Sequence, residues 1–199
     1  MITWITHPDY DIPLPPGHRF TSTKFSDLFS LLKNSKYMKS ATILTPEKAD
    51  ADQVGIAHCS KYVEKIAMGS LDEREQRRLG LQWSPALAKR SFIAVNGSLL
   101  AARSALKHGV SCHLAGGTHH SHFDFGSGFC VFNDLAFTAL TLTKTKEVKN
   151  ILIFDCDVHQ GDGTARILEN NENTFTCSIH ASKNFPYRKA NSDLDIGLD

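Results

Sequence analysis

The chain lacks the features that mark membrane-spanning, secreted and nucleic-acid-binding proteins. No apolar run approaches the roughly 18 residues of a membrane span. The N-terminal stretch MITWITHPDYD has neither the basic nor the apolar segment of a secretory signal. The formal net charge is +1, which gives no reason to expect nucleic acid or anionic lipid as a partner. Internal repeats, low-complexity segments and linkers are also missing. We therefore expect one domain over residues 1–199, with no nucleic-acid or membrane partner.

Cysteine usage gives no sign of a disulfide framework. The five cysteines are an odd number, and none of them forms a C-x-x-C pair. Several lie in apolar runs, which is typical of reduced, buried thiols in a cytoplasmic protein. The apolar content of 41% and the charged content of 22% are ordinary for a globular protein. Histidine, in contrast, is abundant at ten residues.

Apolar periodicity and boundary residues predict helices that alternate with strands. Strands are expected at residues 41–44, 110–114, 151–154 and 174–179, and helices at 26–32, 58–69, 84–109, 133–142 and 165–168. Residues 1–24 and 181–199 read as loop or extended chain. The charge run 72–78 is expected to be a solvated helical face, with partner contact as the alternative. This order predicts an α/β domain with a mainly parallel sheet, whose ligands bind beyond the carboxyl ends of the strands.

The stretch NILIFDCDVHQGDGT, residues 150–164, carries the strongest chemical signal. Its apolar run 151–154 reads as a buried strand that ends at Asp155. If the extended geometry continues, Asp155, Asp157 and His159 share one face. Carboxylate and imidazole are metal ligands, although a D-x-H pair alone is more often a capping Asp and a surface His. Here the flanking Asp155, Asp162 and two glycines, directly after an expected buried strand, favour the metal site. Two glycines, at positions 161 and 163, are expected to allow a tight turn close to whatever is bound.

Two adjacent histidines, His119 and His120, follow a Gly-Gly pair after the expected strand 110–114. They are either the tip of a polar loop or general acid–base groups. In the second case each needs a carboxylate partner to fix its tautomer and basicity. Asp155 and Asp162 are available, which predicts two His–Asp dyads beside one metal. Such a site suits the attack of metal-activated water on a carbonyl group.

Phe129 and Phe185 lie on glycine- and proline-bounded loops that flank these residues. Ordinary loop packing is one interpretation of such aromatics. The alternative is that they form two walls around a slim, apolar arm of the substrate.

The motifs GGTHH, GSGFCVFND and IFDCDVHQGDGT together resemble the signature of the histone deacetylase family. That family includes bacterial deacetylases and acetylpolyamine amidohydrolases and has the arginase–deacetylase fold. The segments LPPGHRF and KNFPYRK…SDLDIGL are most similar to bacterial and class IV members, and the resemblance runs from about His7 to the last residue. It implies a three-layer α/β sandwich and zinc-dependent removal of an acetyl group from acetyl-lysine or a related acetylated amine.

The resemblance assigns roles to individual residues. Asp157 and His159 match two of three ligands for zinc, with ferrous iron as the alternative metal. His119 and His120 match the catalytic pair, in which His120 is the general base and acid. Their partners are Asp155 and Asp162, respectively.

Further matches concern the substrate channel and a second ion. The resemblance implies that Gly128 and Phe129 form one wall of the acyl-lysine channel and Phe185 the other. A structural potassium ion is implied at Asp155, Asp157, His159 and Ser178, partly through backbone carbonyl groups. Gln160 stands where many eukaryotic members have a second histidine, and bacterial members also carry glutamine there.

Members of the family continue well beyond the end of this sequence. Their additional segment brings an aspartate as the third zinc ligand and a tyrosine that holds the substrate oxyanion. Asp193, Asp195 and Asp199 are no convincing substitutes. The resemblance therefore implies a truncated domain without the C-terminal part, with missing central strands, an exposed sheet edge and an open apolar face. We expect no robust activity and poor solubility for these 199 residues alone.

Two further hypotheses belong to other classes. The first is a non-catalytic product, either a fragment or a degenerate paralogue that acts as a binding module or has no function. The second is a binuclear manganese hydrolase of the arginase type. That chemistry needs more bridging carboxylates, and the adjacent histidines argue against it.

Overall fold

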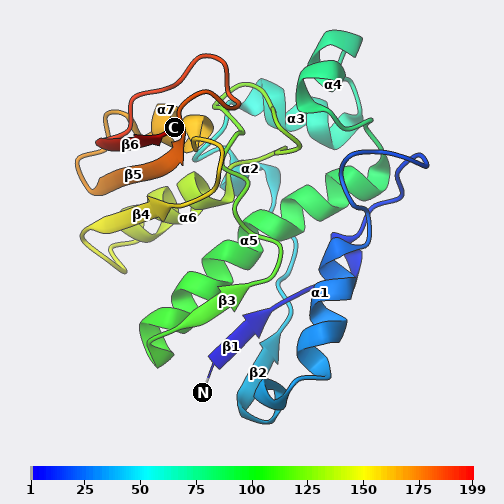
Figure 1. The fold of residues 1–199 in the computed structure, drawn as a ribbon, viewed down its shortest axis with the longest axis vertical. Coiled ribbons are helices and arrows are strands. Elements are labelled where there is room, and N and C mark those ends of the chain that lie inside the picture. Colours follow the sequence, from blue (N-terminus) through cyan, green and yellow to red (C-terminus); the bar gives the residue numbers. More distant parts are fainter. Residues whose placement is uncertain (1) are drawn as a thin grey trace.

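The computed structural model describes residues 2–199 as an α/β fold with two parallel, three-stranded sheets (Figure 1). The strand orders are β2-β1-β3 and β4-β5-β6. The strands are β1 (Ile2–Ile5), β2 (Ala41–Leu44), β3 (Ser111–His113), β4 (Ile151–Asp155), β5 (Thr174–Ala181) and β6 (Leu194–Leu198). The α/β class and the parallel pairing are as predicted, but the strands form two sheets instead of one.

Seven α-helices and two short 3-10 helices surround these sheets in the described chain. They are α1 (Lys24–Lys33), α2 (Ala51–Val54), α3 (Ser60–Met68), α4 (Glu73–Leu79), α5 (Pro85–His108), α6 (Asp134–Lys144), α7 (Asp162–Leu168), η1 (Pro8–Tyr10) and η2 (Lys36–Ser40). Helix α5 runs diagonally through the molecule and contacts β1, β3 and α6 (Figure 1). Helix α7 packs against β5.

The boundaries of α5 follow from local sequence signals. The side chain of Ser84 accepts a hydrogen bond from the backbone N–H of Leu87, and Pro85 occupies the first turn. Gly109 ends the helix with φ of +89°, a conformation that glycine adopts without steric strain. Most of the helix is buried, and it supports the first sheet through its contacts with β1 and β3.

Strands β1 and β6 lie in segments that were predicted to be loop or extended chain. Strand β1 pairs with both β2 and β3 and is therefore the centre of its sheet. Strand β6 pairs with β5, and all five of its residues are exposed. Each strand is too short and too weakly patterned to be recognised alone, because pairing with distant segments decides its conformation.

Strands β3 and β4 are not paired with each other in residues 2–199, and each leaves one edge open. A cavity of about 850 Å³ is lined by β4, by α5 and α6, and by His113 at the end of β3. On β4, Leu152 is 63% and Phe154 59% exposed, and the neighbouring Phe175 is 48% exposed. The prediction of a buried strand is therefore wrong for β4. The expected exposed edge and open apolar face are both present.

The main apolar core lies among α3, α5 and α6, where the ring of Phe132 contacts those of Tyr62 and Phe92. All five cysteines are free, but only Cys130 and Cys177 are buried. The expectation of buried thiols is wrong for Cys112 and Cys156, which are exposed because they lie at a strand edge and in a turn. No described helix is long and apolar enough to cross a bilayer.

Candidate functional site

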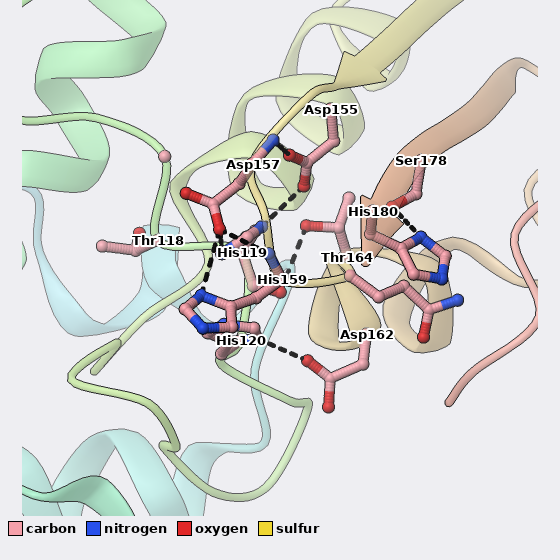
Figure 2. Close-up of polar contacts among 12 residues, drawn as sticks. Thr118, His119, His120, Asp155, Asp157, His159, Asp162, Thr164, Ser178 and His180 are labelled. Carbon is pink, nitrogen blue, oxygen red and sulfur yellow. Dashed lines mark hydrogen bonds and ion pairs between the residues drawn. The ribbon is translucent and has the colours of Figure 1, made fainter. Parts of the chain in front are cut away.

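Three loops that follow β3, β4 and β5 meet on one side of the molecule (Figure 2). The loop after β3 carries His119 and His120, and the loop after β4 carries Asp157 and His159. The end of β5 is tied to the loop after β4 by a hydrogen bond of 3.0 Å from the Ala181 N–H to the Val158 carbonyl, and the loop after β5 brings Phe185 against His120. The predicted convergence at the carboxyl ends of the strands is confirmed, although the strands belong to two sheets.

Both predicted His–Asp dyads are formed. Nδ1 of His119 lies 2.6 Å from Asp155 Oδ2, and Nδ1 of His120 lies 2.7 Å from Asp162 Oδ1. The two imidazole rings are 4.0 Å apart between centroids, and both side chains are buried. These buried contacts exclude the alternative that the adjacent histidines are the tip of a polar loop.

The histidines of the two dyads have pKa values shifted in opposite directions. Burial lowers the pKa of His119, but the hydrogen bond and negative charge of Asp155 outweigh it and raise this pKa above its usual value. Burial lowers the pKa of His120, and the bond to Asp162 does not compensate because His119 adds like charge. His119 is therefore the more cationic ring, and His120 is the neutral one near pH 7.

A third histidine shares the second dyad and was missed from the sequence. Nε2 of His122 lies 3.0 Å from Asp162 Oδ2, and its ring stacks on Phe125 at 4.4 Å. Burial would raise the pKa of Asp162, but its two histidine contacts lower this pKa to about 2. The one sequence feature that pointed to His122 was the spacing H-H-x-H. That spacing does not show that the rings of His120 and His122 contact the same carboxylate.

The start of helix α6 holds the histidine loop in place. The fully buried Asn133 side chain donates to the carbonyl groups of His119 and Ser121, at 3.4 and 3.1 Å. The Asp134 carboxylate accepts from the backbone N–H groups of Gly117 and Thr118, at 3.0 and 2.7 Å. The sequence predicted a helix that begins at this position. The contact of this pair with the histidine loop was missed because that loop lies 12 or more residues away.

Three glycines permit close packing around the dyads. A Cβ on Gly161 would collide with the Asp155 carboxylate, and a Cβ on Gly163 with the carbonyl of Ser121. The predicted tight turn is present at Gly161, whose φ of −73° and ψ of 62° form an inverse γ-turn closed by a 2.8 Å hydrogen bond from the Asp162 N–H to the Gln160 carbonyl. Gly163 lies within α7, where close approach is the reason for glycine. Gly128 has φ of +53°, and a Cβ there would lie 2.6 Å from Cδ2 of His120.

The two predicted zinc ligands lie next to each other. Asp157 Oδ1 is 3.1 Å from Nδ1 of His159, and both side chains are partly exposed. The strand ends at Asp155, so a shared strand face does not bring them together. Instead, the Asp155 carboxylate accepts from the N–H of Asp157, and Asp157 accepts from the N–H of His159, which forms two successive turns.

This donor set fits a metal in chemical type but not in number. Carboxylate and imidazole suit zinc or ferrous iron, and a catalytic zinc takes about three protein ligands. Among residues 2–199, no group of three or more His, Cys, Asp or Glu side chains could hold a metal ion. The described chain therefore offers two candidate ligands, Asp157 and His159, where such a site takes about three.

The residues implied for potassium also gather here. Ser178 on β5 is paired in register with Asp155 on β4, and its buried hydroxyl lies 3.0 Å from Nδ1 of His180. Asp157 and His159 follow within the next turn. A potassium role for these residues stays a prediction.

A pocket of about 720 Å³ opens onto these groups and contains both expected aromatic walls. Phe185 contacts His120 edge-on, with ring centroids 4.8 Å apart. Phe129 has φ of +66° and packs against Phe20 at 5.7 Å. Gly128 lines the same pocket. The pocket brings together the residues predicted to bind substrate, and their binding role stays a prediction.

Comparison with known proteins agrees with this geometry. The model of the histone deacetylase domain matches residues 18–197. An uncharacterized protein of Picosynechococcus sp. is 43% identical over 194 residues, which cover 98% of this chain and 65% of that protein.

The acetoin utilization protein AcuC of Staphylococcus aureus is 32% identical over 192 residues, which cover 92% of this chain and 49% of that protein. AcuC of Staphylococcus xylosus is 31% identical over 178 residues, or 84% of this chain and 46% of that protein. The chain thus spans between about half and two thirds of the length of these relatives. With the domain match over residues 18–197 and both dyads in place, the chain belongs to the histone deacetylase family.

Proposed function

We propose that this protein is a metal-dependent amide hydrolase that removes an acetyl group from acetyl-lysine or a related acetylated amine. The observation that carries the proposal is the pair of His–Asp dyads, with opposite pKa shifts, beside an aromatic-walled pocket. Family membership supports the same reaction class.

In this proposal His120 is the general base and acid. Asp162 accepts the Nδ1 proton of His120, which leaves Nε2 unprotonated for the pocket. The lowered pKa of His120 keeps it neutral, so it takes a proton from the attacking water and passes it to the leaving amine. His119, which is more cationic, stabilises negative charge that develops on the reacting carbonyl oxygen.

Asp157 and His159 would hold the metal, zinc or ferrous iron, together with a ligand that residues 2–199 do not contribute. When bound, such an ion polarises the amide carbonyl as a Lewis acid and lowers the pKa of water. We also propose that Asp155, Asp157, His159 and Ser178 hold potassium, because Asp155 and Ser178 are paired at adjacent strand ends.

The test is acetate release from an acetyl-lysine reporter by the complete polypeptide that the gene encodes, loaded with zinc or ferrous iron. We expect turnover that chelation abolishes and metal restores. Absence of turnover in protein with a verified equivalent of bound metal would refute the proposed reaction.

The alternative function is an inactive deacetylase-like binding module. The two-ligand donor set and the exposed apolar residues of β4 favour it. Metal content separates the two functions, because an inactive module with two ligands should lose zinc during dialysis, whereas an enzyme retains it. The same measurement on these 199 residues alone tests our expectation that they have no robust activity.

A further inference from the structure

The walls of the pocket around His120 carry a strong excess of positive charge. The cationic residues that line it are Arg19, Lys24, Arg77, Arg78 and Arg90. Among the described lining residues the one acidic side chain is Asp157, which is a proposed metal ligand. A metal ion would add further positive charge, so the pocket as a whole favours a negatively charged occupant.

Arg90 is the most deeply placed of these cations. It lies on α5 and is only 3% exposed. Its Nε is buried without a hydrogen-bond partner, and its side chain makes no ion pair within residues 2–199. The guanidinium instead lies over the rings of Phe25 and Phe20, at 4.7 and 5.8 Å. The carboxylates of Asp134 and Asp11 act on Arg90 through their charge without forming an ion pair with it. A buried charge without a directly paired carboxylate is costly, so an anion in the pocket would stabilise this arrangement.

Lys24 adds a second cation to the same pair of rings. Its ammonium group lies 4.4 Å from the Phe20 centroid and 5.0 Å from that of Phe25. Burial and the positive charge of Arg90 both lower the pKa of Lys24. Two like charges therefore share one wall, and no carboxylate of the described chain forms an ion pair with either.

The rim of the pocket is formed by the end of α4. The Phe129 N–H donates to the Leu79 carbonyl at 2.9 Å, which fixes this helix end beside the channel wall. Arg78 lies over the Phe125 ring at 4.3 Å. Arg77 pairs with Glu73, but both side chains are largely exposed and such pairs contribute little. The charge run 72–78 is thus a solvated face at one end and a pocket rim at the other.

We propose that the pocket selects acetylated amines that carry carboxylates, and that it rejects cationic ones. This specificity rests on the proposed function, because the acetyl amide must reach His120. Like charges juxtaposed in a binding site are unfavourable, whereas opposite charges steer and retain the ligand. Acetylated polyamines and acetyl-lysine within basic peptides would therefore be poor ligands. Acetyl-lysine between acidic residues, or an acetylated amino acid with a free carboxylate, would be good ones.

The test compares matched ligands on the complete, metal-loaded polypeptide by calorimetry and by initial rates. One pair is an acetyl-lysine peptide flanked by glutamates and the same peptide flanked by lysines. The second pair is acetyl-lysine with a free carboxylate and its carboxamide, which separates a peptide source from a small-molecule source. We expect the anionic member of each pair to bind on the order of tenfold more tightly, with a ratio that falls as salt is added.

Variants assign the effect to the pocket. Arg78→Gln should reduce the preference about two- to fivefold, the usual range for one exposed charge. Arg74→Gln on the same helix is the control, because Arg74 is exposed and does not line the pocket. Arg90→Gln should reduce the preference for anionic ligands more than Arg78→Gln does. If the Arg90→Gln protein does not fold, Arg78→Gln alone still tests the inference, because Arg78 is exposed.

Equal or tighter binding of the cationic ligands would overturn the inference, as would an equal effect of Arg74→Gln and Arg78→Gln. If the anionic ligands bind preferentially but no acetyl amide is hydrolysed, the proposed reaction fails and the charge selection stands. If cationic and neutral amides are hydrolysed fastest, the reaction stands and the selection fails.

Discussion

The two His–Asp dyads use the same residue types at nearly the same distance, 2.6 and 2.7 Å, yet they differ in protonation. His119 faces three carboxylates, those of Asp155, Asp157 and Asp162, which together raise its pKa. The pKa of His120 is lowered by its burial and by two neighbouring imidazoles, against the effect of one carboxylate. The function of a dyad is therefore set by the charges around it and not by its hydrogen bond alone.

The largest expected effect separates the two histidines. His120→Ala should lower the turnover of the complete, metal-loaded polypeptide by about two to four orders of magnitude, the range for loss of a general acid–base group. His119→Ala should cost less, because it removes electrostatic support and no proton transfer. Initial rates at equal metal content decide this. A greater loss of turnover in His119→Ala than in His120→Ala would mean that His119 is the general base and acid.

The next effect concerns the shared carboxylate. Asp162→Asn should lower kcat by on the order of 10- to 100-fold, since an amide no longer holds the tautomer of His120. The matched variant is His122→Ala, which removes the other partner of Asp162 and leaves the dyad intact. Single-turnover rates should show a much smaller loss there. Equal losses would mean that the three residues act as one cluster.

The dyads should also respond oppositely to pH in unfolding experiments. The pKa of Asp162 is about 2 in the folded protein and 3.8 in its ordinary state, so Asp162 contributes about 2 kcal/mol above pH 4. This contribution is lost as the pH falls through about 2. The raised pKa of His119 contributes stability below its ordinary value of 6.5, which is lost as the pH rises through the folded pKa.

Urea unfolding of the wild type, Asp162→Asn and His119→Gln across pH 2–9 measures both contributions. The wild type and Asp162→Asn should converge in stability at low pH. The wild type and His119→Gln should instead converge at high pH. Parallel curves over the whole range would show that neither dyad is coupled to folding.

The smallest effect tests how closely the second dyad is packed. Gly128→Ala and Gly109→Ala should each cost about 1 kcal/mol, because both glycines have positive φ. Only Gly128→Ala also displaces His120, since Gly109 has no atom within 4 Å of an added Cβ. NMR titration of the imidazoles should therefore show a changed pKa of His120 in Gly128→Ala alone. An unchanged pKa of His120 in Gly128→Ala would show that Gly128 does not pack closely against this ring.

Local signals predicted much of this molecule. The cap at Ser84, the helix start at Asn133 and both dyads follow from residues whose partners are near in sequence or marked by a motif. Strands β1 and β6, the shared use of Asp162 and the buried cation of Arg90 depend on distant segments. Periodicity in a single chain does not contain that information.

The open edges of β3 and β4 have a mechanical consequence for the site. The histidines of both dyads follow β3, in one sheet, whereas Asp155 ends β4, in the other sheet, and Asp162 begins α7 after it. No strand pairing joins the two sheets within residues 2–199, so each His–Asp bond spans the separation between them. A shift of one sheet against the other would stretch both bonds directly. The geometry of the two His–Asp dyads therefore depends on how the two sheets are aligned.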